Sequence, residues 1–155
     1  MKKIFALALV AASLTAAPAM AQTFTGVRVE ATAGADDVTK LNDTTDVVYG
    51  AAVGLDAPVF GGKLVVGVEG SVDNVFERRS AIAGSVRVGV PVGRVMPYVK
   101  AGYENFRDLD GIRVGGGLEY ALTNHVYTKA EYRYTDFQNS GAGRHQGLVG
   151  VGIRF

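Results

Sequence analysis

The chain has 155 residues with 16 basic and 15 acidic side chains, 21 glycines, four prolines and no cysteine. The absence of cysteine excludes a disulfide framework and cysteine-based metal sites. The many glycine, valine, alanine and tyrosine residues favour strands and tight turns over helices.

The first 21 residues are predicted to be a cleaved signal peptide. Lys2 and Lys3 give a positive start, residues 4–14 form an apolar run, and Ala19-Met20-Ala21 is a small-x-small cleavage site. The run is too short for a membrane-spanning helix, which needs about 20 residues. Cleavage leaves 134 residues with a net charge of −1, because both leader lysines are lost. No polybasic patch remains, so no nucleic acid partner is expected.

The remainder, residues 22–155, alternates between apolar and polar residues in segments of about ten, the length of a transmembrane barrel strand. It contains no run of about 18 apolar residues, which excludes a helical membrane protein. Because the last segment would need a partner on each side, the strands are expected to close. The pattern predicts an all-β fold, an eight-stranded antiparallel up-and-down transmembrane β-barrel, with strands at 23–32, 47–55, 63–73, 81–92, 97–104, 112–122, 125–135 and 147–155.

Polar and turn-forming residues separate the predicted strands. An even strand number puts both termini on one side, which in the usual arrangement is the periplasmic side. The connections after the first, third, fifth and seventh strands are then expected outside. These outer loops are predicted at 34–46, 74–79, 105–110 and 136–144, and tight turns at 56–62, 93–94 and 123–124.

One face of the strands carries only uncharged residues, whereas the opposite face combines glycine with charge. A barrel of eight strands has room inside only for packed side chains, and a desolvated interior requires charges that nearly cancel. Thirteen charges, seven basic and six acidic, are therefore predicted to line the lumen: Arg28, Glu30, Glu69, Asp73, Arg87, Lys100, Glu104, Arg113, Glu119, Lys129, Glu131, Arg133 and Arg154. Alternation alone leaves open the reverse orientation, a soluble periplasmic ligand-binding barrel.

Segments 96–103 and 130–137 and the terminal strand ending in Phe155 resemble the small outer-membrane β-barrel superfamily of Gram-negative bacteria, the OmpA-like or opacity-type porin family. The resemblance implies a location in the cell outer membrane. It also implies that the barrel-assembly machinery recognises the last strand through Val149, Val151, Ile153 and Phe155. A monomer surrounded by outer-membrane lipid is expected. Because the chain stops after this strand, no peptidoglycan-binding domain is implied. The sequence identifies no surface ligand.

Motifs for cofactor and metal chemistry have simpler structural interpretations. Gly115-Gly116-Gly117 lacks the Lys-Ser/Thr of a phosphate-binding loop and lies inside a strand pattern. His125 and His145 lie at opposite strand ends without a third ligand at metal spacing. No cofactor or metal is predicted. The tyrosines are interpreted as an interfacial girdle, which includes Tyr103, Tyr120, Tyr132 and Tyr134.

Three function classes follow from this fold. The first is a structural or surface-interaction barrel with a filled polar lumen, which is the main prediction and is not an enzyme. The second is a narrow porin-like channel, which needs a continuous watery path. The third is a lipid A-modifying outer-membrane hydrolase. The last outer loop contains residue types that could form the catalytic triad of such a hydrolase, namely Asp136, Ser140 and His145. The polarity expected of a loop accounts for them more simply.

Overall fold

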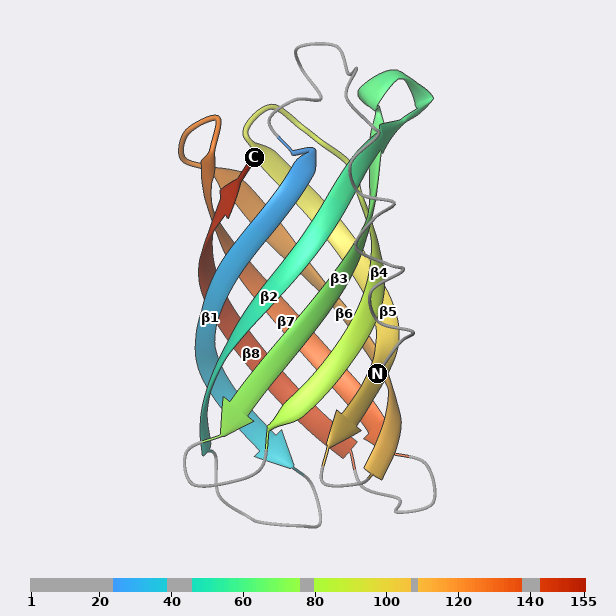
Figure 1. Cartoon of the computed structure of the whole chain (residues 1–155), viewed down its shortest axis with the longest axis vertical. Helices are drawn as coiled ribbons and strands as arrows, with labels where there is room; N and C mark the ends of the chain where they lie inside the picture. The colour runs from blue at the N-terminus through green and yellow to red at the C-terminus, as the bar shows by residue number, and fades with distance from the viewer. Residues whose placement is uncertain (1–23, 39–45, 76–79, 107–108, 138–142) are drawn as a thin grey trace, which may run out of the picture.

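Eight antiparallel strands form a closed barrel in which each strand pairs with its neighbours in sequence and β8 pairs with β1 (Figure 1). The computed structural model describes residues 24–38, 46–75, 80–106, 109–137 and 143–155. The elements are β1 (Gly26–Val38), β2 (Asp46–Val59), the 3-10 turn η3 (Phe60–Gly62), β3 (Leu64–Val75), β4 (Ala81–Gly89), β5 (Val95–Phe106), β6 (Leu109–Ala121), β7 (Val126–Phe137) and β8 (Gly143–Arg154). The predicted fold class is confirmed. Among the described residues, no helix has the length and apolarity needed to cross a membrane.

The two ends of the barrel differ in how the strands are joined. At one end, η3 and the tight turns after β4 and β6 connect the strands, and β1 begins and β8 ends there; we call it the turn end, and it is uppermost in Figure 1. At the opposite end, which we call the loop end, β1 passes to β2, β3 to β4, β5 to β6 and β7 to β8. The predicted placement of both barrel ends of the chain on one side is therefore observed.

The strand bounds differ from the predicted ones because pairing continues past the apolar alternation. The predicted turn at 56–62 starts too early: Asp56 and Pro58 belong to β2 and pair with Gly67 and Val65 of β3. Likewise, residues 34–38 extend β1, although they were expected in a loop. A strand with neighbours on both sides gains backbone hydrogen bonds from each added residue, whatever the polarity of its side chain.

The register around the barrel sets its tilt. One circuit of paired residues that starts at Arg28 returns to β1 at Val38, ten residues further along the strand. The circuit passes through Gly54, Glu69, Ser85, Gly102, Arg113, Thr135 and Arg144. With a rise of ~3.3 Å per residue and a strand spacing of ~4.8 Å, this shear corresponds to a tilt of about 40°.

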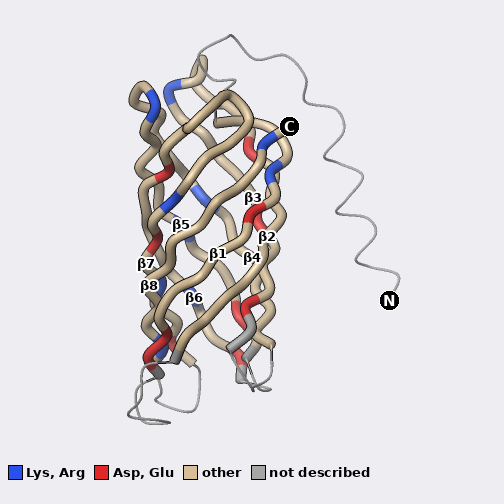
Figure 2. Tube along the Cα trace, turned by 90° about the vertical axis from the view of Figure 1, so that its left-hand side faces the viewer, with Lys and Arg blue, Asp and Glu red and all other residues tan. Residues whose placement is uncertain are grey.

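The strands turn their apolar side chains outward and their charges inward. Val99 and Val149 are 65% and 63% exposed, whereas Arg28 and Glu119 in the interior are 0% exposed. Charged residues of both signs recur along the strands over the whole length of the barrel (Figure 2). The alternative of a soluble ligand-binding barrel, with apolar residues inside, is therefore wrong.

Candidate functional site

The lumen is the chemically distinctive part of this molecule. The structure places all thirteen predicted lumenal charges in the interior, none more than 6% exposed. Three further charged side chains, Asp36, Asp56 and Arg144, are buried with them. Among the described residues the lumen therefore holds eight basic and eight acidic groups, so its formal charge is balanced.

The three additional charges were missed because they fall in segments predicted as loops or turns. Asp36 lies at the end of β1, Asp56 near the end of β2 and Arg144 at the start of β8. Each has the same strand parity as the lumenal residues before or after it, such as Glu30 in β1 and Arg154 in β8. Extending the period-2 pattern by a few residues would have found all three.

Four side chains at the turn end form an apolar plug between the charges and the end of the barrel. Phe24, Val65, Met96 and Ala121 make one buried cluster, and none of them is more than 3% exposed. The guanidinium carbon of Arg154 lies 5.7 Å from the centre of the Phe24 ring. Packed apolar side chains therefore occupy the lumen at this end.

The turn-end cluster consists of Arg28, Asp56, Arg87, Glu119 and Arg154. Arg28 Nε and Arg87 Nε donate to the two oxygens of Asp56 at 2.9 and 2.8 Å. Glu119 accepts from Arg87 Nη1 at 3.0 Å and from Arg154 Nη2 at 2.5 Å. Each carboxylate is thus shared between arginines from different strands.

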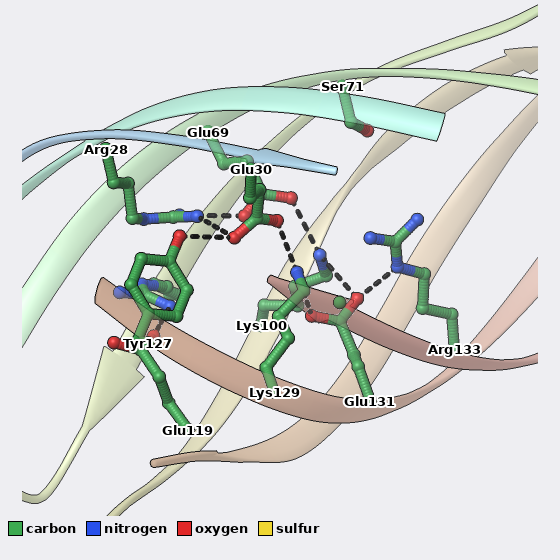
Figure 3. A network of polar contacts seen from close by, with 12 residues as sticks. Arg28, Glu30, Glu69, Ser71, Lys100, Glu119, Tyr127, Lys129, Glu131 and Arg133 are labelled. Atoms are coloured by element: carbon green, nitrogen blue, oxygen red, sulfur yellow. Dashed lines mark hydrogen bonds and ion pairs between the residues drawn. The ribbon is translucent and has the colours of Figure 1, made fainter. Parts of the chain in front are cut away.

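The middle cluster consists of Glu30, Glu69, Lys100, Lys129 and Glu131 (Figure 3). Lys100 Nζ lies 2.8 Å from Glu69 Oε1 and 2.7 Å from Glu131 Oε1. Lys129 pairs with Glu30 and, at 3.2 Å, with Glu131 Oε2. The two lysines therefore hold three carboxylates together across the centre of the barrel.

Two lumenal tyrosines complete the middle of the barrel and explain two of its glycines. The hydroxyl of Tyr127 donates to Glu30 at 2.7 Å, and that of Tyr98 donates to Glu131. A Cβ at Gly152 would lie 2.3 Å from the Tyr127 ring, and one at Gly117 would lie 2.3 Å from the Ala130 carbonyl oxygen and 2.9 Å from the Tyr98 hydroxyl. Wall glycines thus leave the space that the tyrosine rings occupy.

The loop-end cluster joins charges from six different strands: Asp36, Asp73, Glu104, Arg113, Arg133 and Arg144. Arg113 Nη2 pairs with Asp73 at 2.9 Å and with Glu104 at 2.8 Å. Arg144 pairs with Glu104 and, at 2.8 Å, with Asp36. The cluster therefore ties β8 to both β1 and β5.

The three clusters form one connected network. Arg28 of the turn-end cluster also pairs with Glu30 at 3.0 Å and Glu69 at 2.7 Å in the middle cluster. Arg133 of the loop-end cluster pairs with Asp73 at 3.1 Å and with Glu131 of the middle cluster. Desolvating a charge costs several kcal/mol unless paired and hydrogen-bonded, and this network supplies partners along the whole lumen.

The candidate metal and triad residues lie outside this network. His125 is exposed at the turn end, with Nδ1 3.1 Å from the Arg154 carbonyl oxygen; Nδ1 of His145 lies 2.6 Å from the Tyr132 hydroxyl on the outer surface. No group of three His, Cys, Asp and Glu residues in the described part of the chain is arranged to hold a metal ion. Asp136 is exposed, and Ser140 lies outside the described residues.

The predicted assembly and girdle residues face outward. Val149, Val151, Ile153 and Phe155 are 63%, 51%, 49% and 75% exposed, and the Phe155 amide donates to the Val27 carbonyl oxygen at 2.9 Å. Their role as an assembly signal stays a prediction. So does the signal peptide, which lies outside the described residues. Of the tyrosines predicted to form a girdle, Tyr103, Tyr120 and Tyr132 are exposed on the outer face and Tyr134 is half-buried. Their role as an interfacial girdle also stays a prediction.

A family model described as an outer membrane protein beta-barrel domain matches residues 6–155. The chain is also similar to the 25 kDa outer-membrane immunogenic protein of Brucella canis, with 32% identity over 114 residues, covering 59% of this chain and 52% of that protein. The 22 kDa outer membrane protein of Rhizobium leguminosarum bv. viciae is 26% identical over 129 residues, covering 61% and 60%. The chain thus spans about half to three fifths of the length of these relatives.

Solved structures of similar shape are small outer-membrane barrels. Neisserial surface protein A superposes with a TM-score of 0.58 at 17% identity, covering 84% of this chain and 98% of that one. Ail, the attachment invasion locus protein of Yersinia pestis, gives a TM-score of 0.59 at 16% identity, covering 84% and 99%. The outer membrane enzyme PagL gives 0.55 at 14% identity, covering 83% and 99%. These likenesses establish the fold.

Proposed function

The chain belongs to the outer membrane protein β-barrel domain family, and from this premise we propose that it is a closed barrel with a structural and surface-interaction role. It is an outer-membrane β-barrel, so its strands span the bilayer. In this proposal the lumen braces the wall and carries no solute. Contacts with partners outside the cell are made at the loop end.

The observation that carries the proposal is the connected network of sixteen buried charges that fills the lumen next to the apolar plug. A channel requires a continuous watery path, and an eight-stranded barrel is only wide enough to be filled by its own side chains. Here the large arginine and tyrosine side chains occupy that space. Their pairing also makes them costly to displace, because a separated partner is left buried without its counter-charge.

Conductance in a planar lipid bilayer tests the closed lumen. The purified, folded protein is expected to give no discrete ion-sized current steps, while a large porin in the same membrane gives them. Steps that increase in number with the amount of this protein would instead support the narrow porin-like channel and contradict the proposal.

The names of the relatives support exposure at the cell surface. Several are described as outer-membrane immunogenic proteins of Brucella species, a description that fits a protein with surface-accessible segments. None of these names states an enzymatic activity, although one protein with the same fold is named an enzyme. We assign no catalytic role to this chain, because its described triad candidates lie apart from any buried, pre-organised site.

The absence of native cysteine allows a direct test of surface exposure. Asp110→Cys at the loop end and Asn124→Cys at the turn end each introduce a single thiol at an exposed position. In intact cells, a membrane-impermeant maleimide is expected to label the Asp110→Cys variant and not the Asn124→Cys variant. After the cells are lysed, it is expected to label both variants. The reverse pattern would place the loop end in the periplasm and refute a surface role.

A further inference from the structure

Within the described part of the chain, the exposed charged side chains outside the lumen separate by sign between the two ends of the barrel. Among the described residues, Lys63 and Arg94 are the exposed basic side chains, and both lie at the turn end. The exposed acidic side chains Asp37, Asp110 and Asp136 all lie towards the loop end. The turn end therefore presents positive charge without an exposed acidic side chain in the described residues.

All three connections at the turn end expose an apolar residue, and in two of them a basic residue follows two or three positions later. Phe60, Val92 and Leu122 are 78%, 63% and 47% exposed. The apolar and basic partners are Phe60 with Lys63 and Val92 with Arg94, while Leu122 is followed by His125. Exposed apolar residues thus surround the mouth of the barrel, and two of its three turns add a basic side chain.

Backbone geometry holds these side chains at the rim. Gly61 and Gly62 have φ values of +67° and +85°, and the Lys63 amide donates to the Phe60 carbonyl oxygen at 3.4 Å. Val92 and Val95 exchange hydrogen bonds of 2.7 and 3.1 Å around the next turn. Short connections of this kind offer an anchored surface with little conformational entropy to lose on binding.

We propose that the turn end is a docking surface for a phospholipid leaflet with anionic headgroups. Apolar side chains at a membrane boundary enter the region between headgroups and acyl chains, while basic side chains reach the phosphates. An acidic soluble protein would satisfy the charges but leave Phe60 and its two counterparts facing water. The proposal needs only that the barrel spans a bilayer, so it does not depend on the closed lumen.

A tryptophan reporter tests the proposal, since the chain has no native tryptophan. Phe60→Trp places a reporter at the turn end, and Tyr49→Trp, at a 39% exposed position of β2, is the matched reporter towards the loop end. Each folded variant is placed in phosphatidylcholine vesicles that contain brominated phosphatidylglycerol or brominated phosphatidylcholine. Quenching is expected to show about a fivefold preference for the anionic lipid at Phe60→Trp and none at Tyr49→Trp.

Adding Lys63→Gln and Arg94→Gln to the Phe60→Trp variant is expected to bring the preference below about twofold, as is raising the salt concentration to 1 M. Leu122→Trp in the third turn provides a second reporter with the same expected preference. Equal quenching by both lipids at the turn end would overturn the proposal. So would a preference that survives loss of both charges, or binding of a soluble polyglutamate peptide without lipid preference.

Discussion

At the scale of single residues, the lumenal network is redundant almost everywhere. Most buried carboxylates pair with two or more basic side chains; Asp56, for example, contacts Arg28, Arg87 and Arg154. Asp36 differs, because among the described residues it pairs with Arg144 alone. Loss of one partner should therefore lower the free energy of unfolding most at this pair.

Replacing Arg144 with methionine should lower the free energy of unfolding by about 3 to 5 kcal/mol, because it removes the one counter-charge that Asp36 has among the described residues. Adding Asp36→Asn should recover part of that loss, although Glu104 also loses one of its two basic partners. Urea unfolding in phospholipid vesicles measures both effects.

The neighbouring residue is the matched control. Asp37 is exposed on the outer face of β1, so Asp37→Asn should change the free energy of unfolding by less than about 0.5 kcal/mol. If Arg144→Met were no more costly than Asp37→Asn, the loop-end cluster would contribute nothing to stability.

At the scale of elements, β4 shows the alternation most clearly, with buried and exposed residues in strict succession along all nine positions. Arg87 points into the lumen at 2% exposure, and the adjacent Val88 is 42% exposed on the outer face. Because the strand crosses the bilayer, adjacent residues face different environments, one the polar lumen and the next the lipid.

Val88→Arg should therefore reduce the free energy of unfolding in lipid by about 2 to 4 kcal/mol, since it places a charge in hydrocarbon. Val92→Arg, in the turn after β4 and 63% exposed, should cost at most about 1 kcal/mol because it lies near the membrane boundary. Equal costs at the two positions, measured by urea titration, would argue against a lipid-facing outer surface.

At the scale of the whole molecule, closure of the barrel depends on wall residues that are small enough to leave space for the lumenal side chains. On β8, Gly152 faces the Tyr127 ring, and a Cβ there would come within 2.3 Å of it, whereas Gly147 on the same strand faces open space. Space at Gly152 is therefore needed for β8 to pair with both β7 and β1.

Gly152→Val should reduce the fraction of protein that closes, because the added methyl groups overlap Tyr127. Unheated samples on a denaturing gel should lose much of the fast-migrating compact band, while Gly147→Val should keep it. An unchanged band pattern in Gly152→Val would mean that the Tyr127 ring can adopt another position and that closure does not need the glycine.

The amino-acid sequence by itself determined the number of strands, the side of each strand that faces the lumen and the thirteen charges gathered there. The strands and their two faces follow from a period of two residues, which is a local property of the chain and needs no knowledge of partners. The nearly cancelling charges and the glycines on one face indicated that this face lines the lumen. The sequence also indicated that glycines would interleave with large side chains, although not which glycine faces which ring.

Tertiary structure decided which residues pair, how far the strands extend and how the charges connect. Lys129 and Glu30 are 99 residues apart in the chain and meet only because the register across β8 brings them together. Asp36, Asp56 and Arg144 became lumenal because pairing continued past the apolar pattern. The physical reason is that a closed barrel satisfies backbone groups between distant strands, and the resulting shear, which no local pattern contains, sets which side chains share a level of the lumen.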